Sequence, residues 1–287
     1  MALLLSRDGA KLPDFSYMLK VGQLRHIQSI RESGECRNPD VLVSRFLSLS
    51  QRWSCFWRGT LLLDRLRSDP FYYYVIARTK YYDSTFVDAL AQGVQRVINV
   101  GCGSDTRAHR YRDALLSHKT AVLECDQAGA IKAKERIARR RLPMADIEYM
   151  PIDLSEPSWP QLQEWLASNA QKKTLVLMEG VSPYVNEDSY GAFLQMLAHE
   201  LAPGSRVAYD YKIRGVSDVF GMSKRTQRPF RLSTDRQEVT AYHEARSLRV
   251  CALETSAELT SRLLPSRATQ GKRGAFGDDC LLQLEVR

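Results

Sequence analysis

The chain has 287 residues, a formal net charge of +8 and a hydrophobic fraction of 44%. This length allows one large domain or a domain with an appendage, and the composition is typical of a globular protein. No apolar run approaches the roughly 20 residues that span a bilayer, and the first residues lack the basic segment and apolar length of a secretory signal. We therefore expect a cytoplasmic protein without a membrane partner.

The cysteines and the basic residues indicate neither a metal nor a nucleic acid. The six cysteines form no CxxC pair, and no histidine spacing completes a zinc pattern. Much of the positive charge lies in residues 131–141, IKAKERIARRR, where helical spacing distributes it over several faces. Since no nucleic-acid module accompanies this run, we interpret it as a solvated helix.

The N-terminal third has the hydrophobic periodicity of helices. Residues 16–33 and 41–66 each carry apolar positions near a 3.6-residue period, and residues 34–40 separate them. Pro70 ends the second pattern, and residues 79–93 resume a helix that closes at a glycine. We predict a helical cap over residues 1–75.

From residue 96 onward, apolar strand patterns alternate with helical ones. The predicted strands cover residues 96–100, 120–126, 147–154, 173–180, 205–211, 249–254 and 278–286. Such alternation is typical of parallel pairing with helices on both faces of a sheet. We therefore predict an α/β fold over residues 76–287: a Rossmann-like, doubly wound, mostly parallel seven-stranded sheet with an antiparallel late strand.

The turn after the first strand reads GCGSDT, from Gly101 to Thr106. Gly101 and Gly103 let the backbone approach a ligand, and a helix opens behind them. A dinucleotide loop needs a third glycine, which is Thr106 here, and Asp105 would repel a pyrophosphate. The loop therefore favours a cationic ligand without phosphate, such as S-adenosylmethionine, although a nucleotide site or a purely structural turn stays open.

Acidic residues end the next strands. Glu124 and Asp126 share one face of the second strand, with Cys125 on the opposite face. They follow the glycine loop by about 20 residues, which is the spacing of an acid that accepts hydrogen bonds from ribose hydroxyls. Asp153 and Leu154 end the third strand and suit an adenine. Glu179 ends the fourth strand, where the methyl and amino-acid groups of the ligand would meet.

Five segments together resemble the leucine carboxyl methyltransferase family, a branch of the class I S-adenosylmethionine-dependent methyltransferases. They are ARTKYYD, VINVGCGSDTRAHRY, LECDQ, IDL and MEGVSPYV, in family order within residues 75–215. The resemblance implies that Arg78 pairs with the carboxylate of S-adenosylmethionine and that Tyr184 is the family tyrosine. It also implies that the helical cap over residues 1–75 covers the acceptor pocket. The length of the chain is more similar to that of the bacterial members associated with small molecules or natural products than to that of the longer eukaryotic members that modify a phosphatase. Cys102 and Pro183 depart from the family pattern without removing a polar contact.

The resemblance implies an O-methyltransferase that transfers a methyl group to a carboxylate of a small molecule or peptide, with S-adenosylhomocysteine as the product. A hydroxyl or amine acceptor on a natural-product scaffold is the alternative. A nicotinamide-dependent oxidoreductase and a silent S-adenosylmethionine-binding module are further rivals. Tyr184, Tyr209 and His243 are the catalytic candidates, with His109 and Asp210 as others by position. We expect an anionic acceptor, and the sequence leaves a homodimer open.

Overall fold

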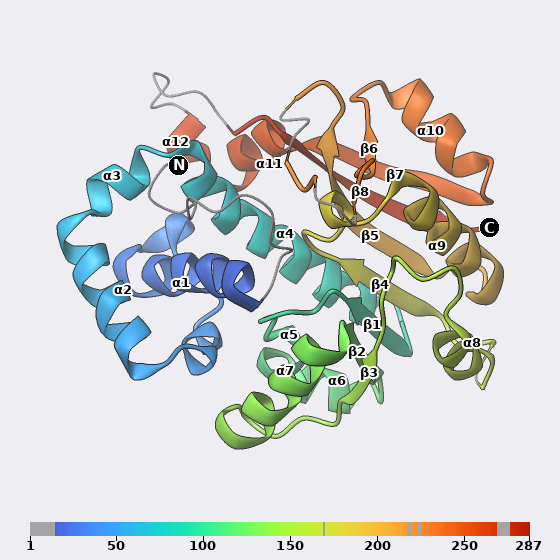
Figure 1. The fold of residues 1–287 in the computed structure, drawn as a ribbon, viewed down its shortest axis with the longest axis horizontal. Coiled ribbons are helices and arrows are strands. Elements are labelled where there is room, and N and C mark those ends of the chain that lie inside the picture. The colour runs from blue at the N-terminus through green and yellow to red at the C-terminus, as the bar shows by residue number, and fades with distance from the viewer. Residues whose placement is uncertain (1–14, 169, 217–219, 223–225, 269–275) are drawn as a thin grey trace.

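An eight-stranded sheet forms the centre of the chain, in the order β3-β2-β1-β4-β5-β8-β7, with β6 beside β5 (Figure 1). The computed structural model describes residues 15–168, 170–216, 220–222, 226–268 and 276–287. The strands are β1 (Arg96–Val100), β2 (Ala121–Asp126), β3 (Glu148–Pro151), β4 (Thr174–Met178), β5 (Arg206–Ile213), β6 (Arg231–Leu232), β7 (Leu248–Thr255) and β8 (Asp279–Val286).

The predicted fold class is confirmed. β1 to β5 pair in parallel, whereas β8 runs antiparallel to both β5 and β7. Strand β6 was not predicted from the sequence, because a strand of two residues shows no periodicity. The first 14 residues, on which the expectation about a secretory signal rests, lie outside the described part of the chain. Within that part, no helix combines the length and the apolar character that crossing a bilayer requires.

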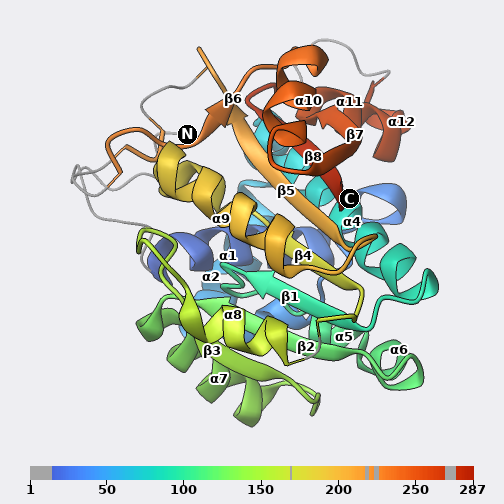
Figure 2. The ribbon, with the colours of Figure 1, turned by 90° about the vertical axis from the view of Figure 1, so that its right-hand side faces the viewer.

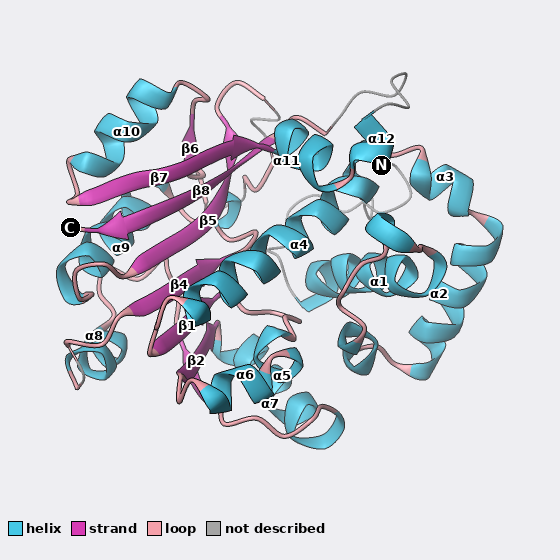
Figure 3. Ribbon diagram, turned by 180° about the vertical axis from the view of Figure 1, so that it is seen from behind, coloured by secondary structure: helices cyan, strands magenta, loops and turns pink. Residues whose placement is uncertain are grey.

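Helices cover both faces of the sheet. Figure 3 shows α4 and α11 across one face, and Figure 2 shows α8, α9 and α10 on the other side. The helices are α1 (Phe15–Arg31), α2 (Leu49–Leu61), α3 (Leu63–Arg67), α4 (Pro70–Ala91), α5 (Arg107–Arg110), α6 (Arg112–Ser117), α7 (Ala128–Arg141), α8 (Pro160–Ala167), α9 (Glu187–Glu200), α10 (Arg236–Glu244), α11 (Ser256–Leu263) and α12 (Pro265–Ala268). Short 3₁₀ helices are η1 (Gly34–Cys36), η2 (Leu42–Phe46) and η3 (Ser182–Tyr184).

Strand alternation divides the apolar interior into two layers. Ile98 and Val176 belong to the layer under α9 and α10, and their neighbours Val97 and Leu175 belong to the layer under α4 and α11. Successive side chains on a strand point to opposite faces, so a shift of one residue changes the layer. The same parity decides which polar strand residues reach the site.

Helix α4 is longer than the sequence predicted. It begins at Pro70, where the side chain of Asp69 caps it by accepting a hydrogen bond from the backbone N–H of Phe71 at 3.0 Å. Proline fits the first helical position, because its missing N–H has no partner there. Since α4 runs through to Ala91, it crosses the predicted boundary between residues 75 and 76. The division into a cap and a second domain stays a prediction.

Candidate functional site

A cavity of about 530 Å³ lies at the carboxyl ends of the parallel strands. Ligands of open α/β sheets bind at this edge. Of the residues that the sequence predicted for the site, those that line the cavity are Arg78, Gly101, Gly103, Asp105, Asp126, Asp153, Leu154, Glu179, Tyr184 and Asp210. Helix α1 adds an apolar wall with Val21, Leu24 and Ile27, beside which the polar Lys20, Gln23 and Arg25 also line the cavity.

The glycine loop after β1 needs its first glycine. Gly101 has φ of +67°, which side chains rarely adopt, and an added Cβ there would clash with Cγ2 of Val181. Val181 follows β4, so the loops after β1 and β4 approach each other at this point. Gly103 also has a positive φ, of +42°. The two glycines therefore bring backbone to the wall of the cavity.

Asp126 is held at the end of β2 by backbone donors. Its Oδ2 accepts from the N–H of Gly103 at 2.8 Å, and its Oδ1 accepts from the N–H of Gln127 at 2.8 Å. Burial raises the pKa of Asp126, and these two donors oppose the rise. A carboxylate has about four lone-pair positions, so this group can still accept hydrogen bonds from a ligand. Asp153 lines the cavity beside it and accepts from the N–H of Ser155 at 3.0 Å.

Glu124, predicted beside Asp126 as a ligand contact, does not reach the cavity. Its side chain is fully buried, and its Oε2 lies 2.9 Å from Nζ of Lys134 on α7. Burial raises the pKa of Glu124 to about 7, with Lys134 opposing the rise. Cys125 lies in the opposite layer, as predicted. Glu124 lies two residues before Asp126, further from the end of the strand, and pairs there with Lys134 of α7. The prediction that Glu124 contacts the ligand is therefore corrected, because its side chain does not line the cavity.

Arg78 joins two acids in the cavity wall. Its Nε lies 3.2 Å from Glu179 Oε1, and its Nη1 lies 3.6 Å from Asp210 Oδ2. The Oδ1 of Asp210 accepts from Tyr82 Oη at 2.8 Å and from the N–H of Gly180 at 2.7 Å. Burial raises the pKa of Asp210 to about 6, with Arg78 opposing the rise. Arg78 therefore lines the cavity while it is paired with two carboxylates of the protein, those of Glu179 and Asp210.

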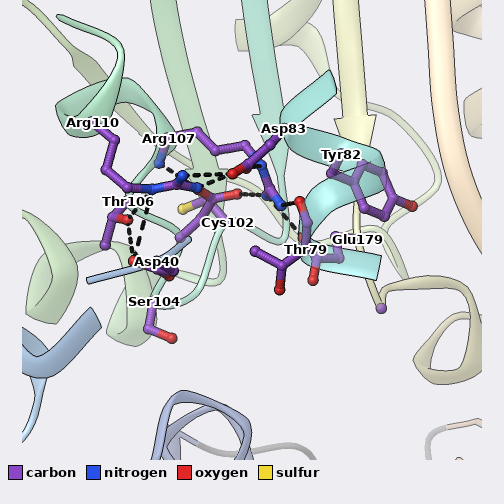
Figure 4. Close-up of polar contacts among 12 residues, drawn as sticks. Asp40, Thr79, Tyr82, Asp83, Cys102, Ser104, Thr106, Arg107, Arg110 and Glu179 are labelled. Carbon is purple, nitrogen blue, oxygen red and sulfur yellow. Dashed lines mark hydrogen bonds and ion pairs between the residues drawn. The ribbon is translucent and has the colours of Figure 1, made fainter. Parts of the chain in front are cut away.

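Arg107, which the sequence analysis did not single out, lies at the centre of a buried charged cluster (Figure 4). Its Nε lies 2.8 Å from Asp83 Oδ1, and its Nη1 pairs with Asp105 and, at 2.8 Å, with Glu179 Oε2. Burial alone would raise the pKa of Asp105, but the neighbouring cations, chiefly Arg107 and then Lys134, together outweigh burial and hold this pKa well below its usual range. Asp105 is thus an ionised residue of the cavity wall whose charge is compensated from behind.

A second arginine extends this cluster towards the N-terminal region. Arg110 makes two contacts with the carboxylate of Asp83, at 2.6 and 2.7 Å, and donates to Thr106 Oγ1 at 3.0 Å. Thr106 donates to Asp40 Oδ1 at 2.6 Å, and Asp40 Oδ2 lies 2.9 Å from Nη1 of Arg25 on α1. The glycine loop is therefore tied to both α4 and α1. Asp83, Thr106 and Arg110 lie in the matching segments, but no spacing rule pairs them with Arg25 and Asp40 in the N-terminal region.

Tyr209 and His243, predicted as catalytic, lie away from the cavity. Both are fully buried, and Tyr209 Oη is 2.6 Å from His243 Nε2. His243 Nδ1 is 2.6 Å from the carbonyl of Val239, and burial lowers the pKa of His243 to about 4. Tyr209 precedes Asp210 on β5, so strand alternation turns it into the opposite layer. The position of this pair disagrees with the prediction that it is catalytic, whereas Tyr184, the third predicted catalytic residue, lines the cavity.

No cluster of histidine, cysteine and acidic side chains suited to a metal occurs among the residues that the structure describes. His109, the other histidine that the sequence offered as a catalytic candidate, lies with its Nδ1 2.8 Å from the carbonyl oxygen of Pro143, as expected for a structural residue. The cavity wall combines carboxylates and backbone groups with five basic side chains: Lys20, Arg25, Arg58, Arg78 and Lys212.

The fold is that of the Rossmann-like methyltransferases. Magnesium protoporphyrin IX methyltransferase from Synechocystis, solved with bound S-adenosylhomocysteine, aligns with 94% of this chain and 95% of its own, with a TM-score of 0.50 and 11% identity. The family model for leucine carboxyl methyltransferase matches residues 39–198. This chain therefore belongs to the leucine carboxyl methyltransferase family.

Relatives in bacteria carry a provisional name as S-adenosyl-L-methionine-dependent methyltransferases. One from Mycobacterium avium is 31% identical over 155 residues, which are 53% of this chain and 46% of the relative. One from Streptomyces coelicolor is 28% identical over 206 residues, 70% of each protein. The chain spans about half the length of the mycobacterial relatives it matches.

Proposed function

We propose that this protein is an S-adenosylmethionine-dependent O-methyltransferase that methylates a carboxylate of a small molecule or peptide. The observation that carries the proposal is the cavity at the strand ends, where Asp126, Asp153 and Glu179 converge behind a glycine loop that has no third glycine. Membership of the leucine carboxyl methyltransferase family supports the same reaction class.

The lining fits the groups of such a cofactor. Asp126, fixed by two backbone N–H groups, suits ribose hydroxyls, which are donors, and Asp153 with the backbone of Leu154 suits an adenine edge. Arg78 suits the carboxylate of the cofactor, and Glu179 suits its ammonium group. When bound, S-adenosylmethionine supplies an electrophilic methyl group.

A carboxylate acceptor agrees with the lining because it is already ionised at neutral pH. It needs positioning and desolvation rather than a strong base. The apolar wall from α1 and the part-buried Tyr184 supply a partly desolvated surface opposite the strand ends. We therefore assign Tyr184 to acceptor positioning.

Asp210 is the observation that favours the alternative, a hydroxyl or amine acceptor on a natural-product scaffold. It lines the cavity, and burial raises its pKa to about 6, which suits a general base. With such an acceptor, kcat/KM falls as the pH drops through about 6, because the base becomes protonated. With a carboxylate acceptor, the rate persists down to the acceptor's own pKa, near 4.

Two measurements test the proposal. Titration calorimetry with S-adenosylhomocysteine and, separately, NADH distinguishes a methyltransferase from a nicotinamide-dependent oxidoreductase; we expect binding of the first alone. The product formed from a labelled methyl donor is then treated with base, which releases methanol from an ester and leaves an ether or amine intact. Binding of S-adenosylhomocysteine without turnover of any acceptor would support the silent module instead.

We also propose a cytoplasmic location. All six cysteines are free, and five of them are buried, which suits a reducing compartment. Fractionation of cells that express the protein tests this, with a secreted or periplasmic pool as the contradicting result.

A further inference from the structure

Helix α2 presents large apolar side chains to solvent. Their exposed fractions are 75% for Leu49, 64% for Trp53, 47% for Phe56, 52% for Trp57 and 73% for Leu61. Single exposed apolar residues are common on protein surfaces, but contiguous groups mark interaction sites. Two of the four tryptophans of the chain belong to this group.

The five residues share one face of the helix. Their spacing of four, three, one and four residues follows the helical period. The buried residues of the helix lie on the opposite face and are small: Cys55 is buried against Ile27 of α1, and a Cβ on Gly59 would lie 3.2 Å from Ile27 Cγ2. Helix α2 therefore packs onto the protein through its small residues and turns its large apolar face, the α2 stripe, outward.

Arginines border the α2 stripe without acidic partners. No acid occurs between Asp40 and Asp64, whereas Arg45, Arg52 and Arg58 lie in that segment. Arg141 of α7 joins them, since its Nη1 donates to the carbonyl of Arg45 at 3.3 Å. Within the part of the chain that the structure describes, none of these four arginines forms an ion pair with a carboxylate. The stripe thus has a positive border.

This border selects among occupants. A second copy docked through the same face would bring two positive borders together, and neither α2 nor the segment from Val41 to Ser48 before it carries an acid to compensate them. An acidic helical peptide would need a groove, yet Arg58 is the only α2 residue that lines the described cavity. Figures 1 and 3 show α2 at the outer edge of the molecule, on the side away from the sheet. A convex helix that carries tryptophan, phenylalanine and leucine beside arginine has the composition of helices that lie in a membrane interface.

We propose that α2 docks on the surface of an anionic lipid bilayer, with the α2 stripe in the headgroup region and Arg45, Arg52 and Arg141 against lipid phosphates, while Arg58 faces the cavity. The helix lies on the bilayer and does not cross it. This inference is independent of the methyl-transfer proposal and departs from the sequence-based expectation that no membrane is involved.

Flotation of the full-length protein with vesicles tests the inference. We expect binding to vesicles that mix phosphatidylcholine with phosphatidylglycerol, little binding to phosphatidylcholine alone, and release by salt. The double variant Trp53→Ser/Trp57→Ser should lose about tenfold or more in partitioning. The double variant Arg45→Gln/Arg141→Gln should lose about fivefold for each charge removed.

Matched controls separate a surface effect from a folding effect. Leu116→Ser removes an apolar side chain of 67% exposure on α6, and Arg112→Gln removes an exposed arginine there; neither should change vesicle binding. Thermal unfolding and S-adenosylhomocysteine binding should be the same in all variants. Absence of binding, or equal binding to neutral vesicles, would overturn the proposal. So would a concentration-dependent dimer, or capture of an acidic peptide, that disappears in the tryptophan variant.

Discussion

Two buried clusters lie on opposite sides of the same sheet and handle ionisable groups in different ways. On the α4 side, Arg107 is surrounded by the carboxylates of Asp83, Asp105 and Glu179. On the α10 side, His243 is held by a tyrosine hydroxyl and a backbone carbonyl, and burial lowers its pKa to about 4. One cluster compensates charge with charge, and the other keeps its titratable group neutral.

The difference shows that a perturbed pKa does not by itself identify a functional site. Both clusters contain shifted groups, but the Arg107 cluster contributes Asp105 and Glu179 to the cavity wall, whereas Tyr209 and His243 are sealed in an aromatic layer. Structural networks also perturb pKa values. Position at the carboxyl ends of the strands is the feature that separates the two.

The largest expected effect comes from the centre of the charged cluster. Arg107→Ala leaves three carboxylates without their shared counter-charge, so we expect the free energy of unfolding to fall by about 3–5 kcal/mol. Chemical denaturation measures the loss. Arg107→Lys keeps the charge and should recover part of it, while Arg112→Ala, at the surface, should stay within about 0.5 kcal/mol. An unchanged unfolding free energy in Arg107→Ala would show that the cluster contributes nothing to the fold.

Loss of a residue from the cavity wall should affect ligand binding instead. Arg78→Ala and Asp126→Ala are each expected to weaken binding of S-adenosylhomocysteine by about 1–3 kcal/mol, because charged hydrogen bonds are lost. Titration calorimetry measures this, with circular dichroism as a check on folding. Glu124→Gln is the matched control on the same strand, since Glu124 lies behind the wall. Equal losses for Glu124→Gln and Asp126→Ala would contradict the distinction between them.

The neutral histidine predicts a pH dependence of stability. Its pKa is near 6.5 in the unfolded chain and about 4 in the folded one, so the unfolded state binds more protons between these values. Stability should therefore fall by about 1–2 kcal/mol as the pH drops from about 7 to about 5. Denaturation at several pH values, compared with His243→Gln, isolates this contribution. The same slope in both proteins would mean that His243 is not responsible.

The smallest effect is expected at the partner of that histidine. Tyr209→Phe removes one hydroxyl and its hydrogen bond to His243, so stability should fall by about 1 kcal/mol. Affinity for S-adenosylhomocysteine and turnover should not change, because Tyr209 does not line the cavity. A reduced turnover number at unchanged stability would return Tyr209 to the catalytic residues.

Most of the fold could be predicted because local patterns of apolar residues determine most of its strands and helices. The apolar runs of β1, β2 and β4 are buried on both faces, and the helical periods around them are regular. Two features could not be predicted locally. Strand β6 is too short to show a period, and α4 extends back to Pro70 because tertiary packing buries the aromatic run before Arg78.

The sequence by itself determined which side chains end the parallel strands, since every such strand delivers its last residues to the same edge of the sheet. It thereby identified Asp126, Asp153 and Glu179 as residues of one site. Only the tertiary structure decided which partner each neighbouring carboxylate has. Whether Glu124 meets a ligand or Lys134, and whether Asp105 meets a ligand or Arg107, depends on helices that pack from elsewhere in the chain. Charge pairing across such distances leaves no trace in local spacing, because it is fixed by packing and not by period.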